Sequence, residues 1–253
     1  MSRLSHAEHL EQLRISLDHL NEIGAGDLDH AVPTCPGWQL RDLLGHLGRV
    51  HRMALAVITT GAMNPASPKD MEPVPGNDDE VRRYFSSSSA ALLHDLGTTD
   101  PASPCWTFLG TDNVVGFWSR RMANEHAVHL YDAQRALSAE PLPVMSSSSA
   151  CDAIDEYVLM ANARVLPKRP DFALGGTIHL HATDDAGGEW MLSSAPGRLN
   201  VETGHGKGDA AIRGTAADLL LGLWGRFSLT DDSRYERFGD PSVVRALTDL
   251  GGN

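Results

Sequence analysis

The sequence predicts an α+β protein in which a helical bundle is followed by a smaller mixed domain. Apolar side chains recur every three or four residues between residues 10 and 137, as on one face of a helix, whereas the chain after Pro170 alternates polar and apolar residues, as strands do. A stretch rich in Pro and Ser, residues 139–149, is typical of a linker. We therefore expect a bundle over residues 1–149 and an α+β domain over residues 150–253.

Four helices are expected in the bundle. The first carries four leucines on one face, from Leu10 to Leu20. The other three are expected over residues 39–58, 77–96 and 114–137, because each range repeats apolar residues at helical spacing and loops that contain proline separate them.

The second domain begins with a helix and continues with short strands. Turn-forming pairs, Gly187-Gly188 and Pro196-Gly197, separate segments that alternate in polarity. We expect the first helix over residues 150–165, strands at 177–181, 189–192, 198–201 and 210–213, and two closing helices over 215–227 and 240–250.

Composition excludes several classes of function. The chain of 253 residues carries 21 Lys and Arg against 33 Asp and Glu, a formal net charge of −12, which disfavours binding to nucleic acid or to anionic lipid. Neither a signal peptide nor an apolar run of about 18 residues is visible. The three cysteines, Cys35, Cys105 and Cys151, form no disulfide framework. We expect a cytoplasmic protein that binds neither nucleic acid nor membrane.

Polar side chains interrupt the apolar face of the fourth helix. Trp118, Met122, Glu125 and His129 are spaced four, three and four residues apart and form one stripe. The two apolar members indicate that the stripe faces the core, so a carboxylate and an imidazole point inward. A buried carboxylate costs several kcal/mol unless a partner compensates it.

The second helix offers a further inward ligand. His46 lies in an apolar stripe between Leu43 and Val50, and helical bundles build metal sites from side chains of facing helices. With Glu125 and His129 it makes a set that suits a divalent metal with an open coordination position. By spacing alone, a hydrogen-bonded Glu–His pair beside a core histidine fits equally well.

Two segments resemble the signatures of the mycothiol-dependent maleylpyruvate isomerase family, which belongs to the DinB-like metal-binding bundles. They are VPTCPGWQLRDLLGHLGRVHRMA, residues 32–54, and RRMANEHAVHLYDA, residues 120–133. The resemblance implies a DinB-like four-helix bundle, a sterol-carrier-like α+β domain, and metal ligands at His46, Glu125 and His129. It also implies mycothiol as the thiol cosubstrate and Zn²⁺ as the expected ion.

The chain departs from the family pattern beside these ligands. Members commonly carry a histidine directly before the glutamate, but here Asn124 precedes it and His126 follows. We expect this change to affect the surroundings of the metal rather than the ligands. Asp132 could orient a ligand or form a salt bridge. His51 could line the mouth of the pocket, but we expect it on the surface.

The second domain offers an arginine for the substrate. The family uses a C-terminal arginine near the bundle site, and Arg226 is the candidate catalytic residue, with Arg213 as the alternative. His179 and His181 share one face of a predicted strand, which we expect to be solvated. Cys35 is expected to be packed rather than nucleophilic.

The expected function is a metal-dependent, mycothiol-using S-transferase. A free thiol has a pKa near ~8.5, and metal coordination would deprotonate it for attack on an electrophilic small molecule. Loss of the thiol after bond rotation would instead give a cis–trans isomerase of the maleylpyruvate type. A non-catalytic, metal-stabilised binding or regulatory module and a metal hydrolase are two further functions that such a site could serve. The sequence predicts neither the electrophile nor the oligomeric state.

Overall fold

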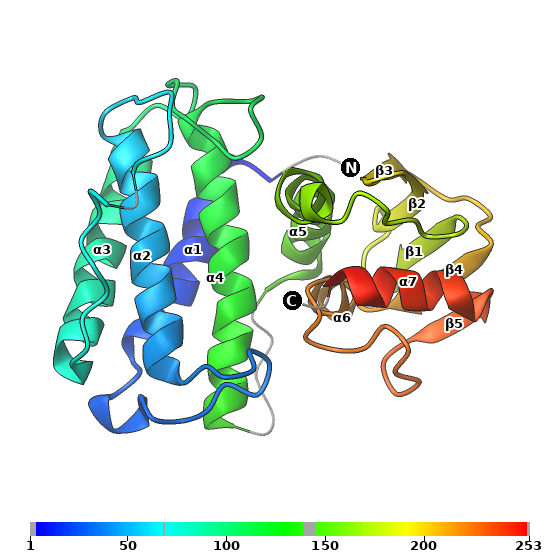
Figure 1. The fold of residues 1–253 in the computed structure, drawn as a ribbon, viewed down its shortest axis with the longest axis horizontal. Coiled ribbons are helices and arrows are strands. Elements are labelled where there is room, and N and C mark those ends of the chain that lie inside the picture. The colour runs from blue at the N-terminus through cyan, green and yellow to red at the C-terminus, as the bar shows by residue number, and fades with distance from the viewer. Residues whose placement is uncertain (1–3, 68, 139–144, 252–253) are drawn as a thin grey trace. The chain divides into compact units, whose positions relative to one another are not determined.

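The computed structural model describes residues 4–67, 69–138 and 145–251. It contains both helices and a five-stranded sheet (Figure 1), which confirms the predicted α+β class. The chain divides into two compact units, Ser5–Val144 and a second that comprises Met145–Asn253 together with Met1–Leu4.

Four helices run side by side in the first unit (Figure 1). Within it, α1 packs against α4 and α2 packs against α3. Trp118 of α4 is fully buried, and its indole N–H donates to the carbonyl of Trp106 at 2.8 Å. The helices are α1 (His6–Asn21), α2 (Leu40–Ile58), α3 (Asp78–Thr98) and α4 (Val115–Leu137).

Polar side chains fix where two of these helices begin. Ser5 caps α1 in a reciprocal capping box with Glu8, and the Asn77 side chain accepts from the backbone N–H groups of Asp79 and Glu80 at the start of α3. Each cap satisfies backbone donors that would otherwise lack an intrahelical partner.

The second unit opens with α5 (Ser147–Met160), which begins earlier than predicted. Ser146 accepts a hydrogen bond from the Ser149 N–H at 3.2 Å and so caps the helix. The predicted boundary between residues 149 and 150 therefore falls inside the first helical turn. After α5 the chain continues through a π-helical turn, Ala161–Val165.

The five strands follow the order β3-β2-β1-β4-β5, with β1 and β4 parallel and the other neighbours antiparallel. The sequence pattern does not predict β5, because its four residues, ERFG, show no apolar alternation. The strands are β1 (Ile178–Ala182), β2 (Glu189–Ala195), β3 (Arg198–Thr203), β4 (Ala210–Gly214) and β5 (Glu236–Gly239), and the closing helices are α6 (Ala216–Leu223) and α7 (Pro241–Gly251).

The two faces of this sheet differ in character. One face carries apolar residues such as Leu180, Trp190 and Ile212, all buried. The Trp190 indole N–H donates to Asp155 of α5 at 2.7 Å, and α6 contacts β1 and β4. The opposite face carries the side chains of His179 and its neighbours.

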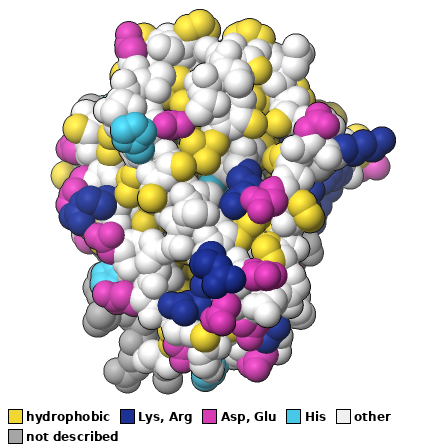
Figure 2. All heavy atoms as spheres, turned by 90° about the vertical axis from the view of Figure 1, so that its left-hand side faces the viewer, with side chains coloured by type: hydrophobic (Ala, Val, Ile, Leu, Met, Phe, Trp, Pro, Cys, Tyr) yellow, Lys and Arg dark blue, Asp and Glu magenta, His cyan; other side chains and the backbone are white. Residues whose placement is uncertain are grey.

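In the part of the chain that is described, no helix is both long and apolar enough to cross a bilayer. On the bundle face shown in Figure 2, basic and acidic side chains are interspersed rather than gathered by sign. No stripe of basic side chains is visible on this face.

Candidate metal-binding site in the helical bundle

The structure brings together the three ligands that the sequence predicts, which we call the bundle site: His46 of α2 and Glu125 and His129 of α4. The Glu125 Oε1 atom lies 3.2 Å from Nε2 of His46 and 3.6 Å from Nε2 of His129. One donor atom from each residue lies within 4.8 Å of the other two. The His46 side chain is 34% exposed, which leaves the site accessible from that side.

Asp132 orients His129. Its Oδ2 atom lies 2.8 Å from Nδ1 of the imidazole. Because an ionised carboxylate only accepts hydrogen bonds, Nδ1 carries a proton, and in the neutral imidazole the lone pair is therefore on Nε2, the nitrogen that faces Glu125. This assignment follows from the hydrogen-bond partner. Of the two roles considered for Asp132, the structure supports the orientation of a ligand.

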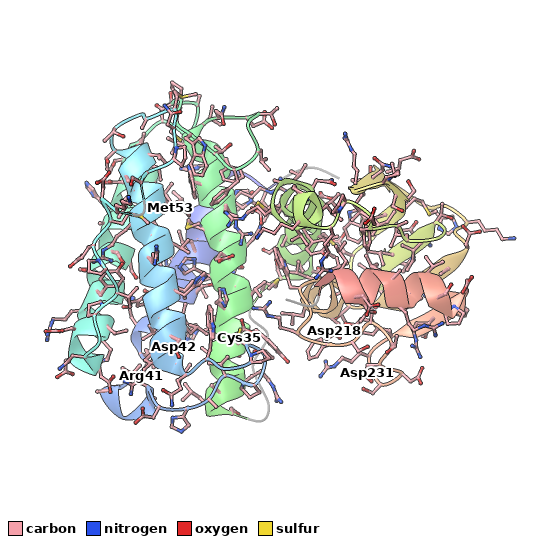
Figure 3. The ribbon with its side chains drawn as sticks, in the orientation of Figure 1. Cys35, Arg41, Asp42, Met53, Asp218 and Asp231 are labelled. Carbon is pink, nitrogen blue, oxygen red and sulfur yellow. The ribbon has the colours of Figure 1, made fainter. Side chains whose placement is uncertain are left out.

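The loop before α2 holds Asp132 in place. The Thr34 hydroxyl donates to Oδ1 of Asp132 at 2.6 Å, and the Cys35 thiol lies 3.4 Å from Oδ2. Cys35 is buried beside α4 (Figure 3), which agrees with the predicted packing role. The two sequence signatures are therefore in direct contact: the first supplies donors to a carboxylate of the second.

The Trp38 ring packs beside the imidazoles of His46 and His129, and the sequence did not predict this contact. Its ring centroid lies 5.2 Å from that of His46 and 6.2 Å from that of His129, and its plane is nearly parallel to the His129 ring. Gly37, with a φ of +84°, lets the chain turn into this position. The indole therefore packs beside both imidazoles, whose Nε2 atoms lie 3.2 and 3.6 Å from Oε1 of Glu125.

Arg121 is the second missed residue. It is buried and forms an ion pair with Oε2 of Glu125, which leaves Oε1 facing the two histidines. The guanidinium offsets the cost of burying the Glu125 charge. The i to i+4 spacing, which places both side chains on one helix face, was the available signal.

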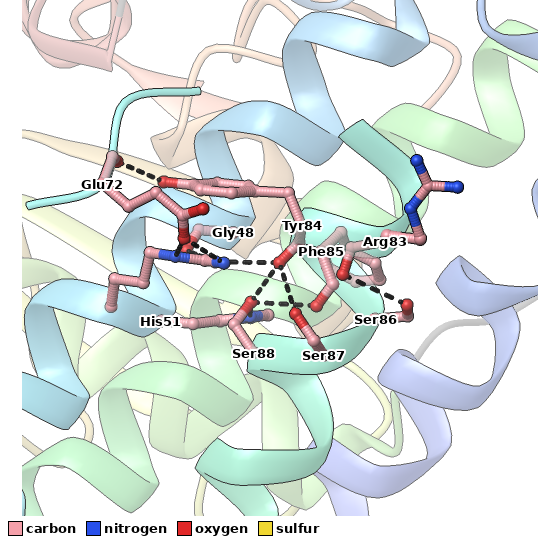
Figure 4. A network of polar contacts seen from close by, with 10 residues as sticks. Gly48, His51, Glu72, Arg83, Tyr84, Phe85, Ser86, Ser87 and Ser88 are labelled. Carbon is pink, nitrogen blue, oxygen red and sulfur yellow. Dashed lines mark hydrogen bonds and ion pairs between the residues drawn. The ribbon is translucent and has the colours of Figure 1, made fainter. Parts of the chain in front are cut away.

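Two further histidines are buried against each other in the bundle core. The Nε2 atoms of His51 and His126 are 2.6 Å apart. The Nδ1 of His126 donates to the Met122 carbonyl at 2.7 Å, and the Nδ1 of His51 lies 2.9 Å from the Ser88 hydroxyl (Figure 4). Burial lowers the pKa of His126 to about 3 and lowers that of His51 well below its usual value.

The predicted surface position of His51 is therefore wrong. The residue is fully buried. It follows Leu44 and Leu47 at helical spacing, on the face of α2 that packs against α3. The apolar stripe that contains His46 lies on another side of the helix, and the prediction considered only that stripe.

The structure gives the contacts of the remaining expected residues within their own units. Asn124 is buried, and its Nδ2 atom has no hydrogen-bond partner among the described residues. In the second unit, Arg226 donates to the Trp224 carbonyl at 2.8 Å and Arg213 forms an ion pair with Glu236 at 2.9 Å. A role for either arginine at the bundle site stays a prediction.

Comparison with known proteins gives consistent results for both units. The family model described as the mycothiol maleylpyruvate isomerase N-terminal domain matches residues 9–134, and that described as the MDMPI C-terminal domain matches residues 148–246. Two similar solved structures are a mycothiol-dependent maleylpyruvate isomerase and its histidine-to-alanine mutant, with TM-scores of 0.60 and 0.61. Each is 14% identical, and the alignment covers 94% of this chain and 95% of the solved one. No curated protein matches the sequence.

Proposed function

The chain belongs to the family of mycothiol maleylpyruvate isomerases, and from this premise we propose that it is an enzyme that uses mycothiol at the bundle site to isomerise a small unsaturated substrate of the maleylpyruvate type. The descriptions of the matched family and structures favour this isomerase over the S-transferase expected from the sequence. The observation that carries the proposal is the convergence of His46, Glu125 and His129 on one point.

The three side chains fit a divalent metal ion. Two imidazole nitrogens and one carboxylate oxygen suit Zn²⁺, and three protein ligands leave a position for a further ligand, as catalytic zinc sites do. The hydrogen bond from His129 to Asp132 is the carboxylate contact that commonly orients a metal-binding histidine. When bound, such an ion would lower the pKa of a coordinated thiol, so that it reacts as the thiolate.

The protein groups around the ligands preorganise the site for a thiolate. Arg121 offsets the charge of Glu125, and Asp132 keeps the proton of His129 on Nδ1. Trp38 covers both imidazoles with an apolar ring. These contacts hold the ligand atoms in one arrangement before any substrate binds, which lowers the cost of reorganisation.

The proposed reaction needs only reversible addition of the thiol. The thiolate sulfur would form a bond to one carbon of the cis double bond while the π electron pair moves onto the conjugated carbonyl oxygen of the substrate as an enolate, so that the carbon–carbon bond becomes single and can rotate. Return of this electron pair then expels the same thiolate and restores the double bond in the trans form. An arginine that binds a carboxylate of the substrate would position it for addition, and we assign this role to Arg226.

An assay with mycothiol and maleylpyruvate tests the proposal, because the candidate functions differ in the fate of the thiol. An isomerase forms the trans product while the free thiol concentration is unchanged at the end of the reaction. An S-transferase consumes one thiol for each conjugate formed, and a binding module does neither. We expect His129→Ala to abolish the reaction and His19→Ala, an exposed histidine of α1, to leave it unchanged. Wild-type protein that binds mycothiol without turnover of any substrate would contradict the proposal.

A further inference from the structure

A second group of potential metal ligands lies on the polar face of the sheet, in the second unit. Its members, which we call the sheet cluster, are His179, His181, Glu189 and His205. Nδ1 of His181 lies 2.9 Å from Oε1 of Glu189, and Nδ1 of His205 lies 3.0 Å from Oε2. Nε2 of His179 lies 3.5 Å from the same Oε2 atom. The donor atoms of the first three members lie within 4.8 Å of one another.

Strand register places the side chains of β1 and β2 together. His181 pairs directly with Glu189 across the antiparallel strands, and His179 lies two residues along β1, on the same face. Cross-strand neighbours of this kind have Cβ atoms about 5 Å apart. A face that we expected to be solvated is therefore partly closed: His179 is only 6% exposed.

The loop between β3 and β4 adds the fourth member. Gly204 has a φ of +117°, a conformation that L side chains rarely adopt. At Gly206 an added Cβ would lie 2.7 Å from the side chain of Met191, so only glycine allows the loop to approach this face so closely. His205 lies between the two glycines, and its side chain, 80% exposed, reaches Glu189.

Hydrogen bonding within the cluster leaves one buried nitrogen unsatisfied. Glu189 accepts a hydrogen bond from His205 and forms an ion pair with His181. Nε2 of His179 is buried, has no hydrogen-bond partner among the described residues and points toward a carboxylate that other imidazoles already contact. A buried polar atom without a partner destabilises the folded protein. A cation bound among the four side chains would provide that partner.

We propose that the sheet cluster binds one divalent transition-metal ion of the zinc class, at a site separate from the bundle site. Imidazole and carboxylate donors suit Zn²⁺, with bonds of about 2.0–2.2 Å. Tetrahedral ligand atoms at such bond lengths are about 3.3 Å apart. The imidazole nitrogens of the sheet cluster lie at similar distances, 2.9 to 3.5 Å, from the carboxylate oxygens of Glu189. Ligand atoms of His179, His181 and Glu189 lie within 4.8 Å of one another, and His205, 3.0 Å from Glu189, would complete a closed four-ligand site of the kind typical of structural zinc. The bound ion would link the β3–β4 loop, through His205, to the side chains of β1 and β2.

Zinc counting on the full chain tests the proposal. Chelator-treated protein is dialysed against Zn²⁺, and the bound metal is measured in the wild type, in His181→Ala/His205→Ala and in His46→Ala/His129→Ala. His19→Ala is the matched control. We expect the sheet variant to bind one ion fewer than the wild type and the control to bind the same number. Equal zinc content in the wild type and the sheet variant overturns the proposal.

The bundle variant separates this site from the proposed enzyme site. If only the sheet cluster binds zinc, the bundle variant keeps the wild-type count and the sheet variant binds none. His205→Ala alone provides a milder change, because the side chain is mostly exposed, and should weaken zinc binding at the sheet cluster by at least about tenfold. In the bundle variant, zinc should shift the imidazole ¹⁵N resonances of His179, His181 and His205; unchanged resonances contradict the assignment.

Discussion

Nδ1 of His129 and Oδ2 of Asp132 are 2.8 Å apart inside the bundle, and this contact determines which nitrogen of the histidine faces Glu125. Asp132 is fully buried and is held by Thr34. Asp132→Asn should therefore weaken zinc binding at the bundle site about 10- to 100-fold, because an amide no longer selects the required tautomer.

Competition between the protein and a metal-binding dye measures that affinity. Asp18→Asn, on the exposed face of α1, is the matched control. Unaltered zinc affinity in a folded Asp132→Asn protein would refute the orienting role of Asp132.

The buried pair of His51 and His126 should make folding sensitive to acid. The pKa of His126 is about 3 in the folded protein, against 6.5 for an ordinary histidine, and that of His51 is lowered as well. Unfolded protein therefore binds more protons below pH 6.5, so stability falls as the pH decreases. His126 alone accounts for a loss of about 2 kcal/mol between pH 7 and pH 5.

Urea unfolding at the two pH values measures this loss. Comparison of the wild type with the double variant His51→Leu/His126→Leu cancels the contributions of other groups. Between pH 7 and pH 5, the free energy of unfolding should fall by at least about 2 kcal/mol less in the double variant than in the wild type. Parallel pH profiles of the wild type and the double variant would rule out the account of a neutral buried pair.

Variants of Arg226 and Arg213 should differ in KM, which shows which arginine binds the substrate. If Arg226 binds a substrate carboxylate, Arg226→Met should raise KM about tenfold or more, since a charged hydrogen bond contributes about 1.5–3 kcal/mol. Arg213→Met should have little effect, because that side chain is exposed and paired with Glu236. Steady-state kinetics of both variants decide between them, and the reverse ranking would transfer the role to Arg213.

Helical spacing was sufficient to predict that three polar side chains of the bundle site face the interior, whereas their role as metal ligands was implied by the family resemblance and stays a prediction. His46, Glu125 and His129 interrupt apolar stripes, and a polar residue within such a stripe must face the interior. The same reasoning missed Arg121 and Trp38. A buried cation such as the arginine is detectable only through its partner, and the position of the tryptophan depends on how a loop folds back.

Residues that depend on strand register were harder to predict. The alternation of β1 showed that His179 and His181 share a face, but not that Glu189 and His205 would lie over it. The pairing of β1 with β2 and the conformation of a loop between two glycines determine those contacts. β5 was missed for a related reason: it is a polar edge strand, and its pairing with β4 rather than its own pattern makes it a strand.

The central claim, that the bundle site binds the sulfur of mycothiol through its metal, is tested most directly with cobalt. The His181→Ala/His205→Ala variant is loaded with Co²⁺, so that only the bundle site contributes, and mycothiol is added without substrate. We predict a sulfur-to-cobalt charge-transfer band that disappears when His129→Ala is introduced. If calorimetry shows that mycothiol binds and no such band forms, the metal does not bind the thiol and the claim is contradicted.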